Sequence, residues 1–100
     1  MADEVRVVAV LNAQEGAGGQ VLAAWPALSA QVHAEDGCLS YDLHPVLGQD
    51  DRFVVLERWA SLAALAAHGR SPHMREFGTS AAAYLAGPPD VTVLADAPVA

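Results

Sequence analysis

The sequence contains no lysine, no isoleucine and a single cysteine, Cys38. One cysteine cannot form a disulfide within the chain, and this favours a reducing compartment, so we expect a cytoplasmic protein. No apolar run approaches the ~18 residues that a membrane-spanning helix needs. No positively charged leader precedes an apolar segment either, so we expect neither a membrane span nor a signal peptide.

Positive charge is also scarce. Five arginines are scattered along the chain against 12 acidic residues, and the formal net charge is −7. Such a balance repels phosphate backbones and anionic membranes, so nucleic acid and membrane surfaces are poor candidate partners. The stretch GAGG, residues 16–19, lacks both the spacing and the lysine of a phosphate-binding loop.

Apolar residues, by contrast, make up 53% of the 100 residues. This length and composition predict a single globular domain over residues 1–100. A domain of this size buries only somewhat more than ~60% of its unfolded surface, so we expect a partner subunit to cover apolar surface that remains exposed.

The hydrophobic pattern predicts a strand over residues 5–11, apolar on both faces, and then a helix over about 17–34. The helix carries a stripe of Val21, Trp25, Leu28 and Val32. Pro26 lies inside it, which predicts either a kink there or a helix that begins near Trp25.

The second half of the pattern predicts an antiparallel hairpin, a pair of helices and a last strand. The hairpin comprises strands near 38–47 and 52–59 around the turn GQDD, the helices follow Ser61 and Ser71, and the last strand covers 91–97. This order is the βαββαβ, ferredoxin-like pattern of an α+β protein with an antiparallel sheet. Its helices cover one face of the sheet, so the bare face is expected to meet its copy in a homodimer.

Two blocks of residues resemble a known family. ERW-S---L--H--SPHM--F, from Glu57, and EDGCLSYDL, from Glu35, are similar to the antibiotic biosynthesis monooxygenase domain family, and especially to its quinol-monooxygenase-like members. The resemblance implies a dimeric α+β barrel with one pocket per subunit. It also implies oxidation of a small-molecule substrate by O₂ without a metal or flavin cofactor.

Some positions depart from the family's patterns. Antibiotic-pathway members have an Asn where this chain has Val55 and a Tyr where it has Leu65, which argues against a polyketide substrate. Haem-degrading relatives have a Trp at the position of His68 and a haem-ligating His at that of Gly78, which argues against a haem role.

The candidate catalytic residue is His68, because an imidazole exchanges protons near neutral pH. The alternative role is helix termination, since a histidine suits the last turn of a helix. Packing in the core is the alternative for the candidate substrate-binding residues. These are Tyr41, Trp59, His73, Met74 and Phe77.

We expect no metal site, because His68 and His73 are separated by Gly69 and Pro72 and do not share a helix face as a zinc pair would. Glu57 is expected to be structural and paired with an arginine or with backbone donors.

The leading hypothesis is a cofactor-independent, monooxygenase-like enzyme that oxidises a small aromatic quinol, with His68 as the proton acceptor. Two alternatives remain open. One is an isomerase of a small carbonyl compound, and the other is a non-catalytic dimeric barrel that binds a hydrophobic small molecule.

Overall fold

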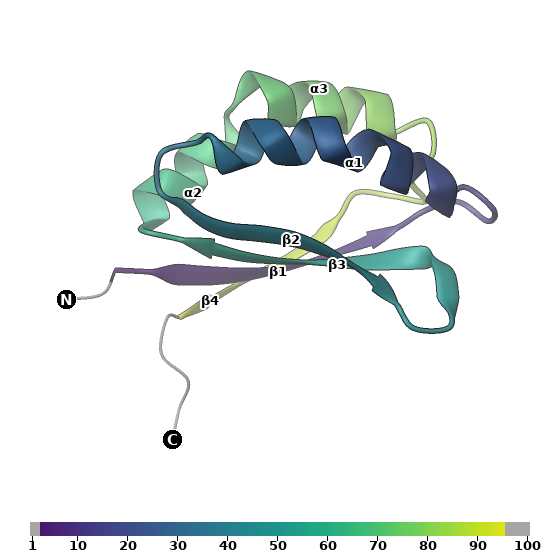
Figure 1. Cartoon of the computed structure of the whole chain (residues 1–100), viewed down its shortest axis with the longest axis horizontal. Coiled ribbons are helices and arrows are strands. Elements are labelled where there is room, and N and C mark those ends of the chain that lie inside the picture. Colours follow the sequence, from purple (N-terminus) through teal and green to yellow (C-terminus); the bar gives the residue numbers. More distant parts are fainter. Residues whose placement is uncertain (1–2, 96–100) are drawn as a thin grey trace.

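The computed structural model describes residues 3–95 and has the predicted order of elements, which confirms the ferredoxin-like α+β fold (Figure 1). In chain order the elements are β1 (Val5–Asn12), α1 (Gly18–His33), β2 (Cys38–Val46), β3 (Gln49–Trp59), α2 (Leu62–Gly69), α3 (Pro72–Ala81) and β4 (Asp90–Ala95). The last strand was predicted over 91–97; β4 begins one residue earlier and continues to the end of the described part, and residues 96–97 lie outside the described residues.

The four strands form one antiparallel sheet in the order β2-β3-β1-β4. Val7 on the central strand β1 faces Glu57 of β3 on one side and Val93 of β4 on the other. Tyr41 of β2 is opposite Glu57 across the β2–β3 ladder. Because paired residues share a face, these four side chains belong to one side of the sheet.

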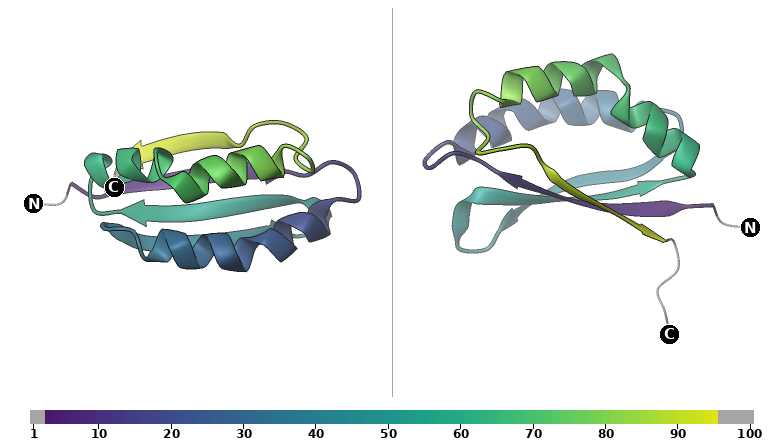
Figure 2. Two further views of the ribbon diagram at one scale, coloured as in Figure 1. Left: turned by 90° about the horizontal axis from the view of Figure 1, so that it is seen from above. Right: turned by 180° about the vertical axis from the view of Figure 1, so that it is seen from behind.

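The helices all lie over that same side of the sheet, as the view from above and the view from behind both show (Figure 2). Helix α1 presents Val21, Leu28 and Val32 to the sheet, and these three are buried as the predicted stripe requires. Phe53 and Trp59 of β3 are almost fully enclosed beneath the helices. Full burial of a large apolar side chain contributes about 1.5–3 kcal/mol, so this layer carries much of the fold's stability.

Helix α1 begins at Gly18 and runs through Pro26, so the alternative start near Trp25 is wrong. Its first turn is held by Asp51 of β3, whose carboxylate oxygens accept hydrogen bonds from the backbone N–H groups of Gly16 and Gly18. A carboxylate at this end of a helix satisfies free N–H groups and suits the helix dipole.

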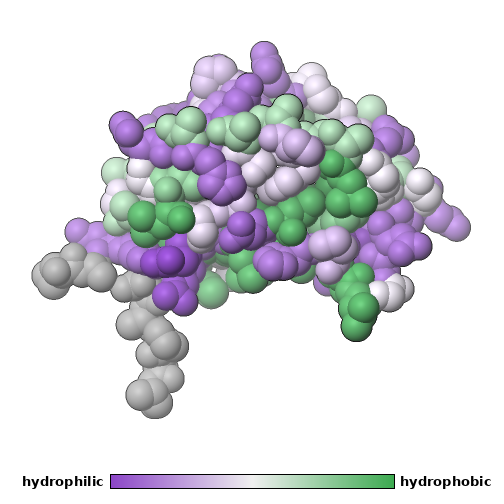
Figure 3. All heavy atoms as spheres, in the orientation of Figure 1, coloured by the Kyte–Doolittle hydropathy of each residue, from purple (hydrophilic) through white to green (hydrophobic). Residues whose placement is uncertain are grey.

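The β2–β3 turn is tighter than the sequence suggested. Val46 pairs with Gln49, which leaves Leu47 and Gly48 as the turn and places the following two aspartates in β3. Gly48 has a φ of 79°, a conformation that favours glycine. Leu47 is 99% exposed, and the space-filling view shows an apolar tip at this turn (Figure 3).

The opposite face of the sheet carries no helix among the described residues (Figures 1 and 2). Its centre is apolar: Val8 is opposite Leu56, and Val10 is opposite Val54. Leu56 and, on β4, Leu94 are large exposed apolar residues. In residues 3–95 we find no helix with the length and hydropathy to cross a bilayer.

Candidate active site

A cavity of about 800 Å³ lies between the sheet and the helices. Its walls are mostly apolar and include residues of all four strands and all three helices. The polar side chains among the lining residues are Trp25, Tyr41, Glu57 and His68, and no arginine is among them. This volume and this composition are typical of small-molecule sites.

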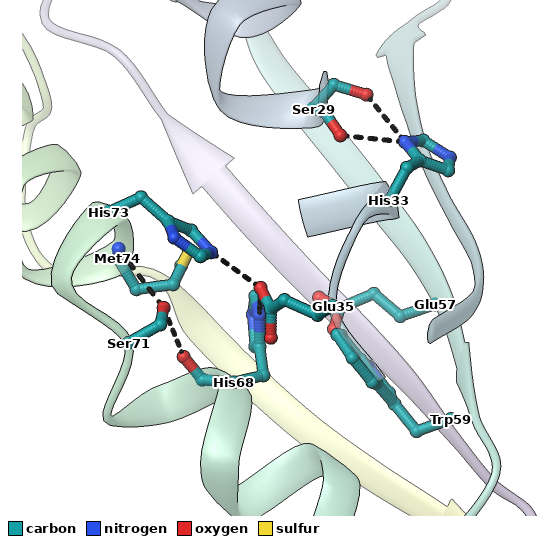
Figure 4. A network of polar contacts seen from close by, with 9 residues as sticks. All are labelled: Ser29, His33, Glu35, Glu57, Trp59, His68, Ser71, His73 and Met74. Atoms are coloured by element: carbon teal, nitrogen blue, oxygen red, sulfur yellow. Dashed lines mark hydrogen bonds and ion pairs between the residues drawn. The ribbon is translucent and has the colours of Figure 1, made fainter. Parts of the chain in front are cut away.

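His68 is in the last turn of α2, and only 7% of its side chain is exposed. Its Nδ1 is 2.9 Å from Oε2 of Glu35, which lies in the connection between α1 and β2 (Figure 4). An ionised carboxylate can only accept, so Nδ1 is the N–H donor and Nε2 is left as an acceptor. Nε2 has no hydrogen-bond partner among residues 3–95. Every fully buried side-chain nitrogen in those residues has a hydrogen-bond partner, so Nε2 is not fully buried. Because His68 lines the cavity, Nε2 is accessible from it.

His73 binds the same carboxylate oxygen, with 2.6 Å between its Nε2 and Oε2 of Glu35 (Figure 4). Glu35 therefore joins two histidines that come from different helices. The three ligand atoms lie within 4.8 Å of one another, and such a donor set could hold a metal ion. Direct N–H···O hydrogen bonds already account for their proximity, and the absence of a metal site stays a prediction.

Aromatic rings fix the imidazole of His68 on two sides. The ring of Trp59 lies behind it at a centroid distance of 4.5 Å, and the ring of Tyr41 meets it edge-on at 5.5 Å. Trp25 of α1 stacks on Tyr41 at 5.1 Å, with the two rings only 8° from parallel. Rings packed in this way leave His68 little freedom to turn its Nε2 away from the cavity.

Glu57 lies in the cavity wall and is only 6% exposed. Its Oε1 accepts a hydrogen bond of 2.9 Å from Nε1 of Trp59, so the predicted partner, an arginine or a backbone donor, is wrong. The side chains of residues i and i+2 of a strand are on one face, and this is why the indole can reach the carboxylate. Burial raises the pKa of the Glu57 carboxyl and the charge of Glu35 adds to the rise, while the Trp59 hydrogen bond and His68 oppose it.

Tyr41 keeps its proton at neutral pH. Burial raises the pKa of its hydroxyl far above the ordinary value, and the carboxylates of Glu57 and Glu35 add to the rise. The hydroxyl is therefore a hydrogen-bond donor or acceptor at the cavity and not a base. Burial likewise raises the pKa of the Cys38 thiol, which disfavours the reactive thiolate at neutral pH.

The local sequence explains how Glu35 reaches His68. Gly37 has a φ of 82°, and a Cβ built on it would lie 2.6 Å from the Cβ of Ala64 in α2. The absence of a side chain at this position lets the connection before β2 approach the helix that carries His68. Ser71 fixes the α2–α3 junction, because its Oγ donates to the carbonyl oxygen of His68 and accepts from the N–H of Met74.

The structure brings most of the predicted site residues to one cavity. Tyr41, His68, Met74 and Phe77 are among its lining residues. Trp59 and His73 are not; Trp59 is fully buried behind His68, and His73 holds Glu35. Direct contact of these two with a substrate stays a prediction.

Sequence reasoning missed three members of the site: Trp25, Glu35 and Glu57. The helical pattern places Trp25 on the core stripe of α1, and the sequence predicts only a structural role for Glu57. Glu35 stands in the EDGC stretch, which carries part of the family resemblance but indicates no separate role for this residue. It lies 33 positions before His68 in the chain, so periodicity offered no sign of their contact.

Comparisons with known proteins agree with this architecture. Residues 4–79 match the family model described as antibiotic biosynthesis monooxygenase. The chain is 35% identical over 95 residues to "Putative monooxygenase Rv0793" of Mycobacterium tuberculosis, covering 95% of this chain and 93% of that protein.

Solved structures show the same fold. The structure of Rv0793 from Mycobacterium tuberculosis has a TM-score of 0.85 at 34% identity and covers 97% of this chain and 98% of its own. The crystal structure of PA3566 from Pseudomonas aeruginosa has a TM-score of 0.88 at 28% identity, with 98% of each chain covered. These similarities support a monooxygenase-like function in general terms.

Proposed function

The chain belongs to the antibiotic biosynthesis monooxygenase family, and on that premise we propose that it oxidises a small aromatic quinol with O₂ and needs no bound cofactor. The observation that carries the proposal is the Glu35–His68 pair. It leaves one imidazole nitrogen unpaired at the wall of an apolar cavity, where a ring can bind.

The first step is transfer of a hydroxyl proton from the quinol to Nε2 of His68. Glu35 stabilises the imidazolium that forms, because its carboxylate already accepts the Nδ1 hydrogen bond. The resulting aromatic anion is electron-rich and passes an electron to O₂.

The remaining steps balance without a reductant. A bond forms between a ring carbon and one oxygen atom, the O–O bond breaks, and the second oxygen atom leaves as water with two hydrogens of the quinol. The product is a hydroxyquinone, and the ring supplies every electron that O₂ accepts. The protein contributes proton transfer, orientation and an apolar enclosure that keeps water from the intermediates.

We also propose that the protein is a cytoplasmic homodimer formed through the bare face of the sheet. The apolar centre of that face, with Val8, Val10 and Leu56, supports this contact. Removing such a surface from water at about 25 cal/mol per Å² favours association. The single cysteine supports the reducing compartment.

The experiment is turnover of a panel of benzo- and naphthohydroquinones by the metal-free protein, in air and under nitrogen. We expect O₂ consumption and hydroxyquinone formation above the uncatalysed rate in air only. His68→Ala should lower kcat by about 10²-fold or more, the usual contribution of a general base. Glu76→Gln, which changes an exposed carboxylate on α3, is the matched control and should leave kcat unchanged.

Each alternative function gives a different result. Turnover that persists under nitrogen would replace the oxygenase with an isomerase. Saturable binding without any product, unaffected by His68→Ala, would replace it with a non-catalytic binding protein.

A further inference from the structure

Glu57 is the least expected group in the cavity wall. The walls around it are apolar, and charged side chains are otherwise absent from the lining apart from His68 when it is protonated. Glu57 is buried, with only 6% of the residue exposed. A carboxylate is seldom buried to this extent unless it has a partner or a task.

The indole of Trp59 satisfies only one of the two carboxylate oxygens. Oε1 accepts the indole N–H, whereas Oε2 has no hydrogen-bond partner among residues 3–95. Every fully buried side-chain oxygen in those residues has a hydrogen-bond partner, so Oε2 is not fully buried. Because Glu57 lines the cavity, Oε2 is accessible from it. A single hydrogen bond from Trp59 therefore holds the carboxylate with its free oxygen available to a ligand.

The surroundings define what that oxygen can bind. Tyr41 is directly opposite Glu57 across the β2–β3 ladder, and His68 packs against both Tyr41 and Trp59. The polar groups thus gather in one region of a cavity that is otherwise formed by side chains such as Val55, Met74 and Phe77.

We propose that Glu57 is a specificity-determining residue whose free oxygen accepts a hydrogen bond from a ligand hydroxyl, so that the cavity selects neutral ring compounds with hydroxyl groups and rejects anionic ones. This inference rests on the proposed function for the location of the ligand. It adds the residue that recognises a ligand hydroxyl and the rejection of anionic ligands. A hydroxyl donor pairs with the carboxylate, while a ligand carboxylate or phosphate would meet its negative charge with no arginine in the lining to offset it.

The test is anaerobic isothermal titration calorimetry with three probes: a naphthohydroquinone, its dimethyl ether and its ring-carboxylated analogue. Without O₂ the experiment measures binding alone, so its result does not depend on turnover. The Kd of wild type for the hydroquinone should be lower than its Kd for either of the other two probes by a factor of about ten or more. A hydrogen bond to a charged group contributes a factor of this size.

Glu57→Gln is the informative variant. Its amide oxygen can keep the Trp59 hydrogen bond, which places the amide NH₂ where the free carboxylate oxygen was. We expect the hydroquinone to lose about tenfold in affinity and the carboxylated probe to gain about tenfold. Glu76→Gln is the control, and its affinities should match those of wild type.

Thermal unfolding of the same proteins separates a binding role from a structural one. A ligand-binding carboxylate lowers the stability of the empty protein, so Glu57→Gln should unfold at the same temperature as wild type or higher. A clearly lower unfolding temperature, unchanged affinities in Glu57→Gln, or binding of none of the probes by wild type would each overturn the inference. Tenfold discrimination without any O₂-dependent turnover would overturn the proposed reaction and leave the role of Glu57 in place.

Discussion

In the proposed reaction His68 is the general base, and the side chains around it hold it in position. His68 offers Nε2 to the cavity, Glu35 binds Nδ1, and Trp59 packs against the ring. His73 bonds to the same oxygen of Glu35 and so limits the movement of the carboxylate. On this account Glu35 is a positioning residue that acts on the reaction only through His68.

Replacing Glu35 by Gln tests that role. The amide is uncharged and cannot stabilise an imidazolium as a carboxylate does, so we expect kcat for hydroquinone oxidation to fall about tenfold or more while KM changes little. The pH–rate profile should shift as well, because the charge beside His68 is lost. Steady-state kinetics across pH, with Glu76→Gln as the control, checks both effects. An unchanged profile would contradict the role of Glu35.

Glu57 gives a prediction for the pH dependence of stability. The pKa of its carboxyl in the folded protein lies above the ordinary value of 4.5, chiefly because it is buried. The folded state therefore binds more protons than the unfolded state between the two values, and this group lowers the free energy of unfolding as pH rises through that interval. Trp59 and His68 oppose the shift and Glu35 adds to it.

Urea unfolding of wild type and Glu57→Gln at several pH values from pH 4 to pH 8 measures this effect. The range starts below the ordinary carboxyl pKa of about 4.5. Gln cannot titrate, so the free energy of unfolding of the variant minus that of wild type should increase as the pH rises from 4. The increase should stop once the pH exceeds the pKa of Glu57 in the folded protein. A difference that stays constant across pH would show that Glu57 does not titrate as its burial requires.

The connection between α1 and β2 depends on Gly37. An alanine there would have a φ near 82°, at a cost of about 1–2 kcal/mol, and its Cβ would lie too close to Ala64. We expect Gly37→Ala to reduce the free energy of unfolding by about 1–3 kcal/mol more than Gly48→Ala does. Gly48 is a matched control, since its φ is 79° and a Cβ there would meet nothing within 4 Å.

Urea unfolding of the two variants gives the comparison. Because Gly37 also allows Glu35 to approach His68, Gly37→Ala should lower kcat in the folded protein, whereas Gly48→Ala should not. Equal losses of stability in the two variants would contradict the tight packing against α2.

The elements themselves were largely predictable because their signals are local. The α1 stripe of Val21, Leu28 and Val32 repeats with the helical period, and Ser61 and Ser71 cap the helices that follow them. The sequence predicts a later turn than the one at Leu47, because polar residues such as Asp50 favour turns, whereas Asp50 here lies at the start of β3, an inner strand of the sheet.

The site was less predictable because it joins distant parts of the chain. His68 and Tyr41 could be proposed from residue type and family resemblance. The contact of Glu35 with His68 spans 33 positions and exists only after α2 packs against the connection between α1 and β2. The Glu57–Trp59 pair was visible as two residues on one strand face, yet sequence alone gives no reason to choose an indole over an arginine as the partner.

At the scale of the whole molecule, the two faces of the sheet have different surroundings. One face forms the floor of the cavity, and the other presents Val8, Val10 and Leu56 without a covering helix among the described residues. An exposed apolar centre of this kind favours pairing with a second copy.

Leu56→Asp tests the proposed dimer. Leu56 is 45% exposed on the bare face, and a carboxylate there would be buried without a partner at the interface. We expect the variant to be monomeric by light scattering at concentrations where wild type is a dimer. Leu22→Asp, at a position of α1 that is 50% exposed, should leave the mass unchanged. A monomeric wild type would contradict the proposal.

The most direct measurement is incorporation of oxygen from ¹⁸O₂ during turnover of a naphthohydroquinone by metal-free protein, followed by mass spectrometry of the product. The account predicts that one labelled oxygen atom enters the hydroxyquinone, that the label depends on the protein, and that His68→Ala abolishes most of it. Product without label, or labelling that is equally fast in His68→Ala, would contradict the claim that this cavity uses His68 to oxidise a quinol with O₂.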